Sequence, residues 1–173
     1  MGAYGARAQS RRLATCPVEV LILAVGSRMP AWVDQAFSEY QKRMPPDARL
    51  RLLEIKPEKR TGGKPAAQLM AAEAARITAA LPRDTFRIAL DERGTQLTSV
   101  SLAAHWRDWR NEGRDLAFII GGPDGLAPPI KSDANFLWSL SQLTLPHALV
   151  RVMLAEQLYR AISILQQHPY HRE

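Results

Sequence analysis

The chain lacks two features that would place it in whole classes of protein. It contains a single cysteine, Cys16, so no disulfide can form within the chain. No apolar run approaches the ~18 residues that a membrane-spanning helix requires, which argues against insertion into a bilayer. We therefore expect a cytoplasmic protein that has neither a disulfide framework nor a membrane anchor.

The sequence also lacks the short motifs of several enzyme classes. It has no Gly-x-Ser-x-Gly elbow, no His-Glu-x-x-His motif and no plausible Cys-His nucleophile, so covalent and zinc-dependent hydrolysis have no support. The stretch Gly121-Gly-Pro-Asp-Gly125 does not match Gly-x-Gly-x-x-Gly and is not followed by Lys-Ser/Thr, which disfavours a dinucleotide or triphosphate site. His168 and His171 have no nearby cluster of Cys or acidic ligands, so we expect no metal site.

Composition and charge describe an ordinary globular chain with a basic bias. The 173 residues are 46% hydrophobic and 23% charged, which suits one domain with a real core. The formal net charge of +6 favours association with a polyanion such as RNA, although a merely basic surface is the simpler alternative. Residues 1–17 carry three arginines and no acid or apolar periodicity, so we expect a disordered leader followed by one domain at 18–173.

Short apolar runs alternate along the chain with segments of helical periodicity. Thr98 stands where an N-cap would precede a helix. The predicted elements are strand 18–25, a helix between Pro30 and Pro45, strand 50–55, helix 65–81, strand 86–90, a helix from Thr98 to Gly113, strand 116–120, a short helix from Pro128, strand 138–143 and a final helix from Pro146 or His147. This alternation predicts an α/β three-layer sandwich with a mostly parallel sheet.

Three predicted strand ends form the candidate binding site. Ligands of open α/β sheets gather at the carboxyl ends of the strands, because the connecting loops meet there. The relevant ends are Leu90, the pair Gly121 and Gly122, and the loop from Ser141 to Pro146. Glycines let backbone groups approach a ligand closely, so we expect a small-molecule pocket lined largely by main chain, although a purely structural turn remains the alternative.

The final helix and the tail carry the other candidate residues. The helix has a broad apolar band that suits packing on the sheet and, in part, contact with a second subunit. Glu156 and Arg160 are spaced for an ion pair within the helix. Tyr170, His171 and Arg172 suit stacking on a base and pairing with phosphate, unless the tail is simply frayed.

Five motifs carry a family resemblance. They are Val25-Gly-Ser-Arg-Met-Pro-Ala-Trp32, Phe118-Ile-Ile-Gly-Gly-Pro-Asp-Gly125-Leu, Trp138-Ser-Leu-Ser-Gln-Leu-Thr-Leu-Pro-His147, Val150-Arg-Val-Met-Leu-Ala-Glu-Gln-Leu-Tyr-Arg160-Ala and His168-Pro-Tyr-His-Arg-Glu173. From about residue 18 to the end, in order and without large gaps, the chain closely resembles the bacterial ribosomal RNA large subunit methyltransferase H family, a minimal group of SPOUT-class enzymes.

The resemblance implies a fold and an activity. It implies a homodimer with a C-terminal trefoil knot that transfers a methyl group from S-adenosylmethionine to N3 of a pseudouridine in large-subunit (23S) ribosomal RNA. The tail of one subunit would lie near the cofactor of the other. Because the domain is small for recognising a large RNA alone, an assembled ribosome or large subunit is the expected substrate.

Carried over position by position, the resemblance also implies residue roles. The cofactor-binding residues would be Leu90, Gly121, Gly122, Ser141, Gln142, Leu143, Thr144, Leu145 and Pro146. His147, Glu156 and His171 are candidates for the base that removes the N3 proton, and they stay unranked. Arg151, Arg160 and Arg172 would contact phosphate or the developing anion, with Tyr170 on the target base.

Two other functions compete with the methyltransferase. A non-catalytic RNA-binding or ribosome-associated factor could retain the pocket without turnover. A nucleotide-dependent enzyme of Rossmann type would instead bind NAD or ATP. Because the five motifs are intact, the methyltransferase is favoured over the non-catalytic RNA-binding factor.

Overall fold

The fold is a parallel sheet between two layers of helices. The computed structural model describes residues 17–171. The elements in chain order are β1 (Val18–Val25), α1 (Ala31–Arg43), β2 (Ala48–Ile55), α2 (Ala66–Ala80), β3 (Thr85–Gln96), α3 (Ser99–Asn111), β4 (Asp115–Ile120), α4 (Pro128–Ser132), β5 (Phe136–Ser139) and α5 (His147–Leu165). The five strands pair in the order β2-β1-β4-β3-β5, and every pairing is parallel. The predicted α/β class with a mostly parallel sheet is confirmed. The expected leader lies outside the described residues, except for position 17.

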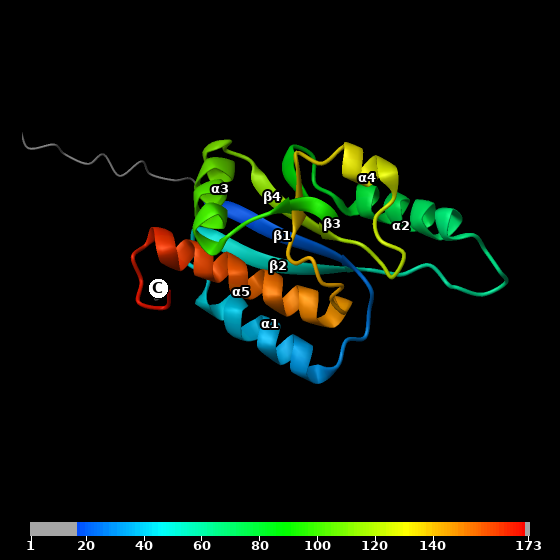
Figure 1. Cartoon of the computed structure of the whole chain (residues 1–173), viewed down its shortest axis with the longest axis horizontal. Helices are drawn as coiled ribbons and strands as arrows, with labels where there is room; N and C mark the ends of the chain where they lie inside the picture. The colour runs from blue at the N-terminus through cyan, green and yellow to red at the C-terminus, as the bar shows by residue number, and fades with distance from the viewer. Residues whose placement is uncertain (1–16, 172–173) are drawn as a thin grey trace, which may run out of the picture.

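Two hydrophobic clusters fix the helical layers on opposite faces of the sheet. One joins α1, α3 and α5 to the sheet through side chains such as Phe37, Leu102 and Leu158. The other joins α2 and α4 to the opposite face through Ile77 and Ile130. Figure 1 shows α1 beside α5 on one side of the sheet and α2 near α4 on the other. Because alternate residues of a strand point to opposite faces, the largely buried strands β1 and β4 supply side chains to both clusters.

Most predicted elements are confirmed, and two strand boundaries were wrong. The Thr98 hydroxyl accepts a hydrogen bond from the Ser101 amide at 3.1 Å, as an N-cap does. Strand β5 covers Phe136–Ser139 instead of the predicted 138–143, because the chain bends after Ser139, whose hydroxyl donates to the Ser141 carbonyl. Strand β3 runs on to Gln96, past the predicted end at Leu90.

The extension of β3 wraps closely around β5. The pairing of these strands shifts register between Leu90 and Thr95, and both residues pair with Trp138. A Cβ on Gly94 would lie 2.7 Å from backbone atoms of Trp138, so only glycine fits at this point. The sequence analysis ends this strand at Leu90, whereas in the structure Asp91–Gly94 forms an irregular segment of the strand.

Helix α5 is predicted to be held mainly by its buried leucines. Replacing Leu158, which is fully buried, with alanine leaves a cavity between α5 and its neighbours. We expect Leu158→Ala to lower the free energy of unfolding by about 3 kcal/mol. Leu165→Ala is the matched control, since Leu165 is 42% exposed and its loss should cost no more than about 0.5 kcal/mol. Chemical denaturation measures both, and equal losses would contradict this packing.

Candidate functional site

A cleft of about 520 Å³ opens where the irregular segment of β3 at Leu90–Arg93 meets the carboxyl ends of β4 and β5. This volume suits a small organic molecule. Its walls come from Leu90–Arg93, Ile120–Gly125, Lys131, Trp138–Ser141, Leu143–Leu145, His147 and Val150. The sequence analysis predicted these three segments from the carboxyl ends of the expected strands, and the structure brings them together. Of the nine expected cofactor-binding residues, seven line the cleft.

The other two expected cofactor residues lie beside the cleft. Gln142 turns its side-chain amide to the Gln96 side chain at 3.3 Å. Pro146 is the N-cap position of α5, and its carbonyl accepts a hydrogen bond from the Val150 amide. Neither residue contributes to the cleft wall. Gln142 connects the loop after β5 to β3, and Pro146 connects the same loop to α5.

The glycine loop is shaped by close approaches of backbone to backbone. A Cβ on Gly121 would lie 2.6 Å from the carbonyl carbon of Gly125, so the turn closes only with glycine at that position. The Gly125 amide donates to the Gly122 carbonyl at 2.8 Å, and Gly125 has a φ of +84°. A Cβ on Gly122 would point to the interior, 2.7 Å from Oε2 of Glu73. A side chain there would press on Glu73 behind the wall.

Two ion pairs border the cleft, and the sequence reasoning missed both. Lys131 lies 2.5 Å from Asp91, and Arg60 lies 2.5 Å from Asp124. Burial pushes the pKa of Asp91 upward, but hydrogen bonds from Lys131 and the Arg93 amide outweigh it and lower the pKa. Asp91 is therefore a carboxylate at neutral pH. No motif marks these pairs, because their members are distant in sequence.

His147 is the one candidate base that lines the cleft. Burial lowers its pKa, and the charges of Arg151 and Arg60 lower it further, while Glu73 and a hydrogen bond with the Gly122 backbone raise it. The effects that lower the pKa of His147 outweigh those that raise it. The imidazole is therefore neutral at neutral pH and can accept a proton. The start of α5 positions it, since His147 is the first residue of that helix.

The remaining candidates gather at the far end of α5. The Glu156 carboxylate accepts hydrogen bonds from Arg160 at 2.5 and 2.9 Å, from the Tyr170 hydroxyl at 3.0 Å and from the Gln157 amide at 2.6 Å. The predicted Glu156–Arg160 ion pair is confirmed. Arg160 also lies over the Tyr170 ring, with 4.9 Å to its centroid. Burial, together with hydrogen bonds to Tyr40 and Glu156, raises the pKa of Tyr170, so its hydroxyl stays protonated.

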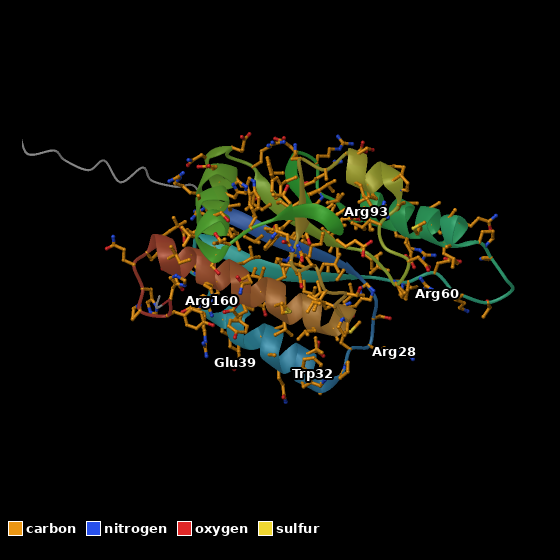
Figure 2. All side chains as sticks on the ribbon, viewed as in Figure 1. Arg28, Trp32, Glu39, Arg60, Arg93 and Arg160 are labelled. Carbon is orange, nitrogen blue, oxygen red and sulfur yellow. The ribbon has the colours of Figure 1, made fainter. Side chains whose placement is uncertain are left out.

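Within one chain this group, which we call the tail cluster (Glu156, Arg160 and Tyr170), does not reach the cleft. A helix rises about 1.5 Å per residue, so Arg160 lies about 20 Å along α5 from His147. Figure 2 shows Arg160 toward the opposite end of the molecule from Arg60 and Arg93. His171 ends the described chain near this cluster, and Arg172 lies outside the described residues.

Arg151 was expected to contact RNA phosphate, and its position contradicts that role. Its side chain is fully buried. Its guanidinium lies 2.6 Å from a carboxylate oxygen of Glu54 and donates to the Gly26 carbonyl at 2.8 Å. Arg151 therefore joins α5 to the ends of β1 and β2, and no surface remains for a phosphate. The sequence does not predict this burial, because a helical arginine is usually exposed.

Among residues 17–171, no group of three or more His, Cys, Asp or Glu side chains is arranged to hold a metal ion. No helix in this part of the chain has the length and apolar character needed to cross a membrane.

Comparison with known proteins defines the class. The family model described as "Predicted SPOUT methyltransferase" matches residues 18–171, and the chain belongs to this family. A structure of a probable methylase family protein from Haemophilus influenzae Rd KW20 shares the fold, with a TM-score of 0.53 and 10% identity over 92% of this chain and 72% of the other.

Curated relatives give the narrower group. Proteins named "Ribosomal RNA large subunit methyltransferase H" from Ralstonia pickettii and Bordetella avium are 59% and 58% identical to this chain over 155 residues. Each alignment covers 90% of this chain and 99% of the relative. A third, from Paraburkholderia xenovorans, is 58% identical over 151 residues, or 87% of this chain and 97% of its own length. The resemblance stated from the motifs is thereby confirmed.

The lowered pKa of His147 predicts a pH dependence of stability. The unfolded chain binds a proton near the ordinary pKa of 6.5, whereas the folded chain resists protonation until a lower pH. The unfolded state thus binds more protons below pH 6.5, so the free energy of unfolding falls as the pH falls through this window. The His147→Gln variant should lose less stability between about pH 7 and pH 5.5. Urea unfolding measures this difference, and parallel curves would refute it.

Proposed function

We propose that this protein transfers the methyl group of S-adenosylmethionine to N3 of a pseudouridine in 23S ribosomal RNA. The observation that carries the proposal is the cleft between the irregular segment of β3 and the loops that follow β4 and β5. The names of the 59% and 58% identical relatives support ribosomal RNA as the substrate. We place the reaction in the cytoplasm, on the assembled ribosome or large subunit.

The residues of the cleft fit S-adenosylmethionine. Apolar side chains of Leu90, Leu143 and Leu145 supply walls for a flat ring, and backbone groups of the same loops supply hydrogen bonds. The close glycine turn keeps side chains out of the space beside Gly121. When bound, this cofactor supplies a methyl group on a sulfonium whose leaving group is a neutral thioether, so neither a metal nor an acid is required.

The protein must then orient the base and remove a proton. The imide N3 of pseudouridine becomes a nucleophile when it loses its proton, and His147 is placed to accept that proton as a neutral imidazole. With S-adenosylmethionine bound, this N3 electron pair would attack the methyl carbon, and the thioether would leave. Glu156 is occupied by four donors, so it serves better to hold Arg160 and Tyr170 than to accept a proton.

We propose a homodimer in which the tail cluster of one subunit completes the cleft of the other. Within one chain, Arg160 of the tail cluster lies about 20 Å along α5 from His147 of the cleft. The tail cluster and the cleft can therefore cooperate only when they come from different chains. Exposed apolar side chains near the start of α1 and α5, Trp32 and Leu149, supply surface for such an interface. There Arg160, Arg172 and His171 would contact phosphate or the developing anion, and Tyr170 would stack on the base.

We also propose that the C-terminal segment forms a trefoil knot. The close passage of Gly94 against the Trp138 backbone supports it, as does the register shift of β3 around β5. After β5, at the edge of the sheet, the chain returns to pack α5 against α1 and α3.

The activity is tested by mass spectrometry of ribosomal RNA nucleosides from cells with and without this protein. We expect N3-methylpseudouridine only when the protein is present. Purified protein should bind S-adenosylmethionine in calorimetry and methylate ribosomes that lack the modification. Binding without methyl transfer would instead favour the non-catalytic RNA-binding factor, and affinity for NAD or ATP alone would favour the nucleotide-dependent enzyme.

The shared site is tested by mixing two inactive variants. Gly121→Val disrupts the cleft, and deletion of residues 168–173 removes the tail. In a mixed dimer, one site combines an intact cleft with an intact tail, so a one-to-one mixture should recover up to about a quarter of the wild-type activity. Each variant alone should be inactive on ribosomes. No recovery after verified subunit exchange would place each site within a single chain.

A further inference from the structure

Glu73 is a buried acid that neither the fold nor the cleft wall explains. It lies on α2 between Leu69 and Ile77, on the apolar stripe that packs against the sheet, and it is 2% exposed. One carboxylate oxygen accepts a hydrogen bond from the Glu58 amide at 3.0 Å. The other oxygen is buried and has no hydrogen-bond partner among the described residues. Burying such an oxygen unpaired is costly, so a structural role alone does not account for it.

The free oxygen points at the back of the glycine wall. A Cβ built on Gly122 would lie 2.7 Å from Oε2 of Glu73 and 3.2 Å from a methyl group of Val25. Because Gly122 has no side chain, the carboxylate can approach the wall from behind while the front of Gly122 lines the cleft. Glu73 thus places a negative charge directly next to the cleft without entering it.

His147 meets the same glycine from the cleft. Its imidazole forms a hydrogen bond with the Gly122 backbone, and its Nδ1 atom is buried without a partner among the described residues. The charged groups that act on this ring are Arg151 of α5 and Arg60 of the loop before α2, which oppose its protonation, and Glu73, which favours it. Arg151 is paired with Glu54 and Arg60 with Asp124, whereas Glu73 lies across Gly122 with one oxygen unpaired among the described residues.

We propose that Glu73 is a positioning residue for methyl transfer, whose carboxylate behind Gly122 stabilises the imidazolium formed when His147 takes the N3 proton. The inference rests on the proposed function. The proton moves from N3 of the target base to the imidazole, and Glu73 neither gives nor takes a proton in this step. Without the carboxylate, the positive ring would lose the acid that faces it across Gly122, since the nearby Arg151 and Arg60 already hold Glu54 and Asp124 as their partners.

The test uses Glu73→Gln in the full-length protein. Glutamine keeps the shape and the oxygen that accepts from the Glu58 amide, but removes the charge. We expect the NMR titration midpoint of His147 to fall in this variant, its signal being assigned by its loss in His147→Gln. Thermal stability should be unchanged or higher, because an unpaired buried charge disappears. Turnover on ribosomes should fall by at least about tenfold, with the calorimetric affinity for S-adenosylmethionine within about twofold of wild type.

Glu58→Gln is the matched control. Glu58 is close in sequence and space, but its carboxylate pairs with Arg76 and Lys64 instead of facing His147. It should leave both the His147 midpoint and turnover unchanged. In the His147→Gln background, Glu73→Gln should have no further effect on turnover, because the group on which it acts is gone.

The outcomes separate this inference from the proposed function. An unchanged His147 midpoint in Glu73→Gln would overturn the inference, and so would a loss of stability with an unchanged midpoint, which indicates a structural acid. A lowered midpoint in a protein that methylates no ribosome would support the coupling of Glu73 to His147 and overturn the proposed function instead.

Discussion

The buried guanidinium of Arg151 is the contact on which the arrangement of the cleft depends. It joins the first turns of α5 to the ends of β1 and β2 through Glu54 and the Gly26 carbonyl. Removing either partner from a buried charge is far more costly than an exposed ion pair is worth, so this contact is unlike the surface pairs elsewhere in the chain. Because His147 lies one turn before Arg151, the same contact sets where the imidazole meets the cleft.

Around this anchor, the cleft is a product of backbone geometry more than of side chains. Gly121 and Gly94 each allow two stretches of main chain to approach more closely than any Cβ permits. Behind the glycine loop Glu73 lies on one side of Gly122, and His147 lies on the other side, at the cleft. Such an arrangement can tune a proton acceptor without placing a charge in contact with the ligand.

Helix α5 carries candidate functional side chains in two separate places. Its first residue belongs to the cleft, whereas Glu156 and Arg160 organise Tyr170 at the other end. A rigid helix keeps these groups apart within one chain, and this separation gives the proposed dimer a function beyond added surface. The basic charge of the chain would then be doubled on one particle that faces RNA.

Local pattern predicted most of the fold and the approximate site. Periodicity located the helices and the buried strands, and the rule that ligands gather at strand ends selected the three loops that do form the cleft. The sequence prediction was wrong where contacts between distant segments set the strand ends. These places are the extension of β3 along Trp138 and the early end of β5. There the register between strands, not the residues' own preferences, sets the boundaries.

The amino-acid sequence by itself determined the alternation of strands and helices, the glycine turn and the Glu156–Arg160 pair, since each depends on neighbours a few residues apart. Only the tertiary structure decided that Arg151 is buried, that Glu73 lies behind Gly122 and that His147 faces the cleft while the tail cluster does not. Burial and charge depend on partners from distant segments, and no spacing along a single chain encodes which partners the folded sheet will bring together.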